Sequence, residues 1–378
     1  MTANPEELLA DPQALEAADH GGTLRLVAQG GARIRRAANL RELDPAGAQA
    51  LERLAADGRP RAVVLLGYGT GATVSALIAA VAGAAVGVPI LSVPGPALPG
   101  WIGPLDLVVV ASTTGRSPEI ATALSEAGRR GCRVVVVAPA SSELGRLAEP
   151  ARAVLLGMAD EVAPVWSRLW SVAVPALLAV EAVGVVPAQP YEAAAAAADD
   201  AAVRFRPSQE AFVNPAKEIA LHCAERPVAV WAGGAVAAVA AERLADLAVL
   251  RAGRAVLHAA LPDLGRAQLG LLDARAGEPE TDLFYDPEVD GPREGAPTPA
   301  FALLAEAGVD PRTEVVEAMV RERGLPLSFL TAEQPTSLER AAYLISLADF
   351  TACYLAAATA ASPEQGRAVE EYRDRTAQ

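Results

Sequence analysis

Runs of β-branched residues, each followed by a helix-like segment, constrain the fold of this chain more than any other feature of its sequence. The runs VVLL, LVVVA and RVVVVA occupy residues 63–66, 107–111 and 133–138. Continuous apolar strands of this kind are typical of parallel sheets that are covered by helices on both faces. Right-handed crossovers then predict an α/β fold, a doubly wound parallel sheet inside a three-layer αβα sandwich.

A second series of the same kind begins near Pro227 and predicts a second sheet. Its segments read PVAVWAGGAVAAVAAERLADL, RAVLHAALPDL and TDLFYDPEVDGP. The segment between the two series is mostly helical in pattern, with breaks at Pro207 and Pro215. We therefore expect two doubly wound subdomains with helical extensions, one within residues 1–197 and one within 198–378.

Charge and cysteine content exclude several classes of partner. The formal charge is −14, from 32 basic and 46 acidic residues, so neither nucleic acid nor an anionic membrane surface is an expected partner. The apolar stretch ALIAAVAGAAVGVPIL is shorter than the roughly 20 residues of a membrane helix. Cys132, Cys223 and Cys353 lie far apart, so no metal site is expected, and reduced thiols indicate the cytoplasm.

Several hydroxyl side chains gather where the second strand of the first series ends and a helix begins. The turn contains Ser112, Thr114 and Ser117, with Glu119 in the first turn of the helix. A helix N-terminus with such neutral donors at the carboxyl end of a strand is suited to binding phosphate. A plain helix cap is the alternative, because Ser and Thr are also standard N-cap residues.

The glycine-rich loop LLGYGTGATV adds Gly69 and Thr70 to the expected phosphate site. A dinucleotide-binding fingerprint is the competing interpretation of this loop. That fingerprint requires an acidic residue at the end of the next strand, and the segment VPILSVPG ends without one. We therefore expect no nucleotide cofactor.

Four segments of the chain resemble one known family. LPGWIGPLDLVVVASTTGRSPEI is similar to the first half of a sugar isomerase (SIS) domain, and in particular to bifunctional phosphoglucose/phosphomannose isomerases. The family pattern there is approximately L-P-x-W-V-G-x-x-D-L-V-V-x-x-S-Y-S-G-x-T-x-E-T. The residues that fit it are Leu98, Pro99, Trp101, Gly103, Asp106 and Ser112, with Thr114 and Ser117 as conservative substitutes. The resemblance continues through NPAKEIA, LFYDPEVDGP and SLERAAYLISLADFTACYLA, so it covers most of the chain.

The resemblance implies two SIS subdomains, a homodimer and a sugar-phosphate ligand, with an active site near the interface. The family interconverts glucose or mannose 6-phosphate and fructose 6-phosphate without metal or cofactor. A base moves a proton between C2 and C1 through an enediol. Family members use a glutamate in an Asn-Glu-Asn-x-Lys helix, a histidine in Asn-His-Asn-Glu and a lysine near the C-terminus.

This sequence departs from the family at each of those catalytic positions. Leu250 or a neighbour stands at the glutamate position, and Gly265 and Arg266 replace the polar pair around the histidine. Arg373 is the nearest counterpart of the terminal lysine, and arginine stays charged near neutral pH. We therefore expect weak or lost isomerase activity.

Other side chains are candidates for the missing roles. His258, Asp263 and Arg373 are the candidate catalytic residues, although a histidine in an apolar pattern is more often a packed or surface residue. Glu119 and Arg168 are candidate ligand-binding residues, and for Arg168 a surface salt bridge is the alternative.

Three functions fit these observations. The first is a sugar-phosphate-binding protein of the glucose-6-phosphate/mannose-6-phosphate isomerase family with an eroded catalytic set. The second is an active isomerase, an intramolecular oxidoreductase, that uses a non-standard base. The third is a structural dimer without a ligand.

Overall fold

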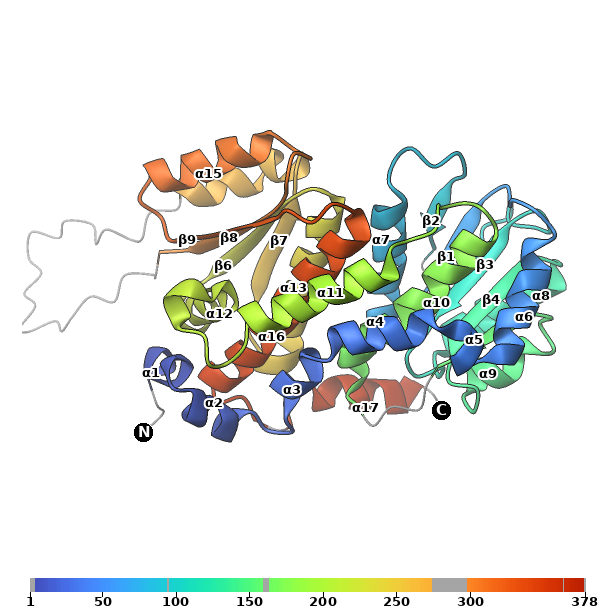
Figure 1. Cartoon of the computed structure of the whole chain (residues 1–378), viewed down its shortest axis with the longest axis horizontal. Coiled ribbons are helices and arrows are strands. Elements are labelled where there is room, and N and C mark those ends of the chain that lie inside the picture. Colours follow the sequence, from blue (N-terminus) through green and yellow to red (C-terminus); the bar gives the residue numbers. More distant parts are fainter. Residues whose placement is uncertain (1–3, 94, 159–162, 274–297, 363, 377–378) are drawn as a thin grey trace, which may run out of the picture. The chain divides into compact units, whose positions relative to one another are not determined.

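The chain forms two compact units, each built on one parallel sheet (Figure 1). The computed structural model describes residues 4–93, 95–158, 163–273, 298–362 and 364–376. The five-stranded unit comprises Arg25–Ala202, Pro335–Tyr343 and Arg367–Gln378. The four-stranded unit comprises Met1–Leu24, Val203–Gln334 and Leu344–Gly366. The expectation of two parallel-sheet α/β units is confirmed.

The sheet of the five-stranded unit has the strand order β2-β1-β3-β4-β5, and all its neighbours are parallel. Its strands are β1 (Val63–Leu66), β2 (Ile90–Ser92), β3 (Leu107–Ala111), β4 (Arg133–Ala138) and β5 (Val154–Gly157). The β-branched runs of the sequence are β1, β3 and β4, the three central strands. Their residues are almost fully buried, as expected for strands covered on both faces.

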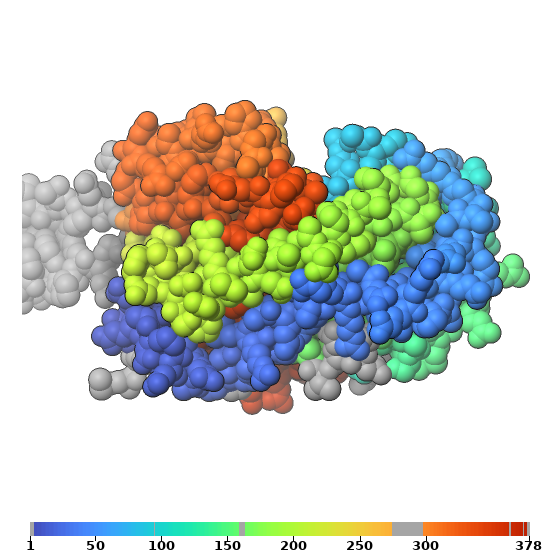
Figure 2. All heavy atoms as spheres, in the orientation of Figure 1, coloured from blue at the N-terminus to red at the C-terminus, as the bar shows by residue number. Residues whose placement is uncertain are grey.

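Helices cover both faces of this sheet. Two of them, α8 (Pro118–Arg129) and α9 (Glu143–Ala148), pack on the face that carries Val108 and Val134. Two others, α7 (Thr70–Ala82) and α10 (Leu169–Ala182), pack together and contact the strands as well. The remaining helices of the unit are α4 (Gly30–Ala38), α5 (Leu40–Leu43), α6 (Pro45–Ala55), the 3-10 helix η1 (Val165–Arg168), α11 (Tyr191–Arg204) and α17 (Arg367–Thr376). Figure 2 shows α4 to α6, in blue, on the surface.

The sheet of the four-stranded unit has the order β7-β6-β8-β9, again entirely parallel. Its strands are β6 (Val228–Gly233), β7 (Val256–Ala260), β8 (Ala300–Glu306) and β9 (Leu327–Ala332). The rings of Trp231 and Phe301 are in tilted contact, with 4.6 Å between their centroids, and pack with residues of α15 (Arg312–Glu322). The unit also contains α1 (Pro5–Ala10), α2 (Pro12–Ala18), η2 (Ala211–Val213), α12 (Pro215–Glu225), α13 (Ala235–Ala252), η3 (Asp263–Arg266) and η4 (Gln268–Asp273).

Helices α3 (Thr23–Val27) and α16 (Ser337–Ala358) contribute residues to both units. Within the described residues, α16 and the η1–α10 segment Val165–Ala182 are long and apolar enough to cross a membrane by length and composition. Their apolar windows are 94% and 72% buried, respectively, so both act as core helices here. The segments TDLFYDPEVDGP and LFYDPEVDGP lie outside the described residues.

Candidate functional site

The carboxyl ends of β1 and β3 carry the two loops that were predicted to bind phosphate. These strands are neighbours at the point where the strand order reverses, because the chain continues from β1 to β2 on one side and from β3 to β4 on the other. In doubly wound sheets, ligands bind at the carboxyl ends of the strands beside such a switch point. Gly69 and residues 112–117 lie in these two loops, and Thr70 is the first residue of α7.

Glycines let the loops at this end of the sheet approach one another closely. A Cβ atom on Gly71 would lie 2.3 Å from the carbonyl oxygen of Ala111, so α7 begins directly against the end of β3. A Cβ atom on Gly115 would lie 2.0 Å from Oγ of Ser142, in the turn that follows β4. The loops after β1, β3 and β4 therefore meet around the predicted turn.

The turn after β3 presents several donors that no protein group uses. Ser112 and Thr113 are 8% and 6% exposed, and Ser112 Oγ accepts a 2.9 Å hydrogen bond from the amide of Gly115. Within the described residues, the hydroxyl groups of Thr113 and Thr114 and the backbone amides of Thr113, Thr114 and Arg116 meet no protein hydrogen-bond partner. Thr114 is half-buried and Arg116 is exposed, so this set of donors is open to solvent and can reach a ligand. These donors suit a small anion.

Ser117 serves as the N-cap of α8, which is the alternative to a role as a phosphate ligand. Its Oγ accepts a hydrogen bond from the amide of Ile120, and its hydroxyl donates to Oε2 of Glu119 at 2.7 Å. The Ser117 hydroxyl, together with a backbone hydrogen bond, holds the pKa of Glu119 below its usual range. Glu119 is therefore ionised near neutral pH, and the Ser117 proton already has an acceptor.

Arg168 lies at the end of η1, which is a neighbour of α7. It is half-buried, and its Nε donates to the carbonyl oxygen of Ala163 at 2.8 Å. Trp166 and Trp170, on the same segment, are buried in the core. Their helical spacing thus reflects packing.

The candidate catalytic residues lie in other parts of the chain. His258 is exposed on β7, an edge strand of the four-stranded sheet. Asp263 is also exposed, and it pairs with Arg266 at 3.5 Å. Arg373 lies in α17, and its side chain is outside the described part of the structure.

Residues of the family-like segment 98–106 form a structural loop at the amino end of the sheet. Asp106 is fully buried and accepts two hydrogen bonds from Arg61, at 3.0 and 2.6 Å, and one from the amide of Gly103. Arg61 also lies over the ring of Trp101 and donates to its carbonyl oxygen. The family-like residues 98–106 therefore stabilise the fold, whereas the later residues of the same family-like segment form the turn after β3.

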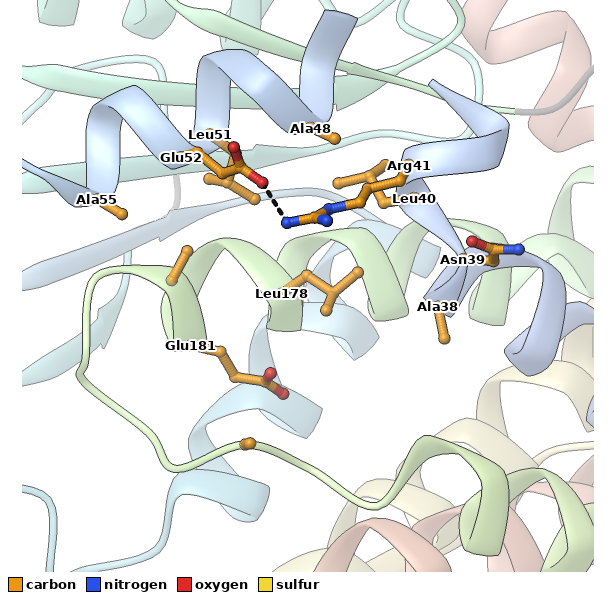
Figure 3. Close-up of a pocket in the computed structure, with 12 residues that line it drawn as sticks. Ala38, Asn39, Leu40, Arg41, Ala48, Leu51, Glu52, Ala55, Leu178 and Glu181 are labelled. Atoms are coloured by element: carbon orange, nitrogen blue, oxygen red, sulfur yellow. Dashed lines mark hydrogen bonds and ion pairs between the residues drawn. The ribbon is translucent and has the colours of Figure 1, made fainter. Parts of the chain in front are cut away.

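A cavity of about 540 Å³ lies elsewhere in the five-stranded unit, among α5, α6 and α10 (Figure 3). Most of its lining is alanine and leucine, and its charged pair Arg41 and Glu52 forms an ion pair at 2.7 Å. None of the residues predicted for the phosphate site lines it.

The four-stranded unit has the equivalent switch point, between β6 and β8, but fills it with its own carboxylate. Glu306, at the end of β8, is 6% exposed and accepts from the amides of Val236 (2.8 Å) and Ala237 (3.2 Å) at the start of α13. Gly234 has φ +125, and a Cβ atom there would lie 2.2 Å from Glu306 Oε1. No sequence motif indicates the contact between Glu306 and α13, because this glutamate simply follows a run rich in alanine and leucine.

Lys217, the single lysine of the chain, is likewise used inside the four-stranded unit. The side chain is 1% exposed, and its Nζ donates to the carbonyl oxygens of Leu9, Pro207 and Gln209 at 2.7–2.8 Å. It also lies 5.7 Å from the ring centroid of Tyr354. Lys217, part of the NPAKEIA segment, thus binds the N-terminal helix α1 and the loop before η2 to α12.

Comparison with known proteins identifies the fold. Residues 212–376 match the family described as the bacterial phospho-glucose isomerase C-terminal SIS domain. A hypothetical protein from Thermus thermophilus superposes with a TM-score of 0.65 at 16% identity, over 99% of this chain and 97% of that one. Tagatose-6-phosphate ketose/aldose isomerase from Escherichia coli gives 0.65 at 15% identity, over 92% and 97%.

A third similar structure is the C-terminal domain of glucosamine-fructose-6-phosphate aminotransferase from Francisella tularensis. It has a TM-score of 0.58 at 11% identity, over 89% of this chain and 96% of that one. No curated protein matches the sequence. At these identities the superpositions show the fold, while the family model connects the C-terminal part to a named group. The chain as a whole therefore has the SIS fold, and its residues 212–376 resemble the C-terminal SIS domain of bacterial phosphoglucose isomerases.

Proposed function

We propose that this protein binds a sugar phosphate in the turn after β3 and that its isomerase activity is weak or lost. The observation that carries the proposal is the set of unused donors at Thr113, Thr114 and Arg116 beside a sheet switch point. Neutral hydroxyl groups and backbone amides bind phosphate without a lysine, as in other anion-binding turns. Gly69, Thr70 and Ser112 complete the proposed phosphate site, and Ser117 holds its helix terminus in place.

The eroded catalytic set supports the second half of the proposal. Arg251, beside the position expected for the family's glutamate, donates to Oγ1 of Thr23 at 3.1 Å, so its side chain serves a contact within the four-stranded unit. The only lysine of the chain is buried at position 217, far in sequence from the C-terminal lysine of the family. Loss of a general base alone reduces the rate by about 10²–10⁴-fold.

Ligand binding is tested by thermal shift with fructose, glucose and mannose 6-phosphates on wild type and Thr114→Val. Wild type should be stabilised by at least one of them, and Thr114→Val should lose most of that shift. Thr122→Val is the matched control, because Thr122 is exposed on α8 and its hydroxyl donates only to the carbonyl oxygen of Pro118. Absence of stabilisation by every sugar phosphate would instead support the structural dimer.

A coupled isomerase assay on the same proteins decides between binding and catalysis. Turnover that disappears in Thr114→Val would support the alternative function, an active isomerase with a non-standard base. Glu119 is the observation that favours this alternative, because it is ionised and half-buried beside the turn. Our proposal expects turnover close to that of the buffer alone.

We further infer two SIS subdomains, divided near residue 197, and a homodimer, as the family resemblance implies, and a cytoplasmic location from the cysteine content. Cys132, Cys223 and Cys353 are buried free thiols in the structure, which is compatible with a reducing compartment. Light scattering coupled to size exclusion would measure the mass in solution. A mass of 38.8 kDa, that of one chain, would contradict the dimer.

A further inference from the structure

Tyr68 lies between two glycines in the loop that connects β1 to α7. It is flanked by Gly67 and Gly69, so it carries the only side chain of these three residues. A Cβ atom on Gly67 would lie 2.5 Å from backbone atoms of Gly71, and Gly69 has φ +53, so both neighbours are required to be glycine. Close packing at Gly67 and the positive φ of Gly69 thus define the backbone on either side of Tyr68, which is 43% exposed.

The hydroxyl group of Tyr68 lies where the loops after β1 and β2 come close to α8. A Cβ atom on Gly95, in the loop after β2, would lie 3.2 Å from Tyr68 Oη and 3.6 Å from the carbonyl oxygen of Glu119. The phenol thus lies beside the first turn of α8, the helix that begins directly after the proposed phosphate turn.

The protonation states of Tyr68 and Glu119 make them complementary. Burial, and to a smaller extent the charge of Glu119, raise the pKa of Tyr68, so the phenol keeps its proton near neutral pH. Glu119 is ionised, because the Ser117 hydroxyl lowers its pKa. One hydroxyl donor and one carboxylate acceptor therefore lie at the start of α8, the helix that follows the turn. Inorganic phosphate needs only the turn, whereas a polyhydroxylated ligand also offers groups for these two side chains.

We propose that Tyr68 is a specificity residue that binds a hydroxyl group of the sugar while the turn after β3 holds the phosphate. This proposal rests on the proposed function. It assigns to the phenol a contact that distinguishes a sugar phosphate from free phosphate.

The test compares dissociation constants of fructose 6-phosphate and inorganic phosphate for wild type, Tyr68→Phe and the control Tyr372→Phe, whose tyrosine is exposed on α17. Tyr68→Phe should weaken fructose 6-phosphate about three- to tenfold, the effect of one hydrogen bond, and leave inorganic phosphate unchanged. Tyr372→Phe should alter neither. Gly95→Ala, which moves the phenol without removing it, should also weaken the sugar phosphate selectively.

Two different failures can be told apart. Equal affinity of wild type and Tyr68→Phe for fructose 6-phosphate, with phosphate still bound, would overturn the role of Tyr68 alone. An equal loss of both ligands in Tyr68→Phe would also contradict it, because the phenol would then support the turn itself. If wild type bound neither ligand, both the proposed function and the role of Tyr68 would be contradicted.

Discussion

The two sheets have the same order in their first four strands and differ at the same place, the switch point between β1 and β3 in one and between β6 and β8 in the other. In the five-stranded unit, the end of β3 leaves the hydroxyl groups of Thr113 and Thr114 and nearby amides without protein partners among the described residues. In the four-stranded unit, the end of β8 carries Glu306, which accepts from two amides of α13. One switch point leaves its donors free for a ligand, and the donors of the other are already bonded to the side chain of Glu306.

The difference shows that a fold supplies a position and that single side chains decide its use. A helix N-terminus at a switch point binds anions through its amides and its dipole. A buried carboxylate of the chain itself can bind these amides and interact with the dipole as well as a ligand does. Because it belongs to the same chain, its effective concentration is far higher than that of a free ligand. The four-stranded unit also uses its single lysine internally, on three carbonyl oxygens. These contacts are the reason that we propose ligand binding in the five-stranded unit.

Of the substitutions that test this comparison, Lys217→Met is expected to change the free energy of unfolding most. The substitution leaves three carbonyl oxygens without their donor, and each lost partner of a buried polar group costs about 1–3 kcal/mol. Relief of the buried charge offsets part of this, so we expect a loss of about 4 kcal/mol in the free energy of unfolding, measured with urea. A loss below about 1 kcal/mol would show that the four-stranded unit does not depend on its internal charges.

The pH dependence of stability tests the same side chain without changing it. Burial lowers the pKa of Lys217 to about 8 from its ordinary value of 10.5. Between these values the unfolded chain binds a proton that the folded chain does not, so stability from this group rises with pH, by up to about 3 kcal/mol. Below pH 8 the group is protonated in both states and gives no slope. Urea unfolding of wild type and Lys217→Met across pH 8–10.5 measures the difference, and parallel curves would contradict the prediction.

Glu306→Ala should convert the closed switch point into an open one. Two amides of α13 lose a charged acceptor, which predicts a loss of about 3 kcal/mol in unfolding free energy. Millimolar inorganic phosphate should then recover part of the melting temperature, because the vacated helix terminus accepts an anion. Glu306→Gln keeps an acceptor and should lose about 1 kcal/mol. Melting curves of Glu306→Ala that are insensitive to phosphate would show that the two switch points are not equivalent.

Ser117→Ala is the smallest change and separates capping from binding. Loss of the N-cap of α8 should lower the unfolding free energy by about 1 kcal/mol. The affinity for a sugar phosphate should fall less than in Thr114→Val, because the Ser117 proton already goes to Glu119. If Ser117→Ala abolished binding while its stability was unchanged, the hydroxyl would be a phosphate ligand and not a cap.

The first sheet could be predicted from the sequence better than the second. The runs that form β1, β3 and β4 are rich in valine, so their strand character is plain, and α16 occupies the residues of the predicted pattern SLERAAYLISLADFTACYLAAA. The strands β8 and β9 were not expected, because AFALLAE and LSFLTA have the alanine and leucine content of helices. Only burial in the middle of a sheet makes β8 a strand, and that is a tertiary effect.

The candidate site is indicated by its spacing and is missed where it depends on contacts between loops. Hydroxyl groups after a buried strand indicate the turn, since local sequence determines that position. Three features depend on contacts that the turn pattern does not contain. They are the choice between a cap and a ligand role for Ser117, the proximity of Tyr68 to Gly95, and the hydrogen bonds of Glu306 to α13. No periodicity carries such information.

Titration calorimetry with fructose 6-phosphate on wild type, Thr114→Val and Glu306→Gln tests the central claim most directly. The account predicts one molecule bound per chain, an affinity reduced by about tenfold or more in Thr114→Val, and unchanged stoichiometry in Glu306→Gln. Binding by Thr114→Val as tight as that of wild type, or two equivalent sites per chain, would contradict it.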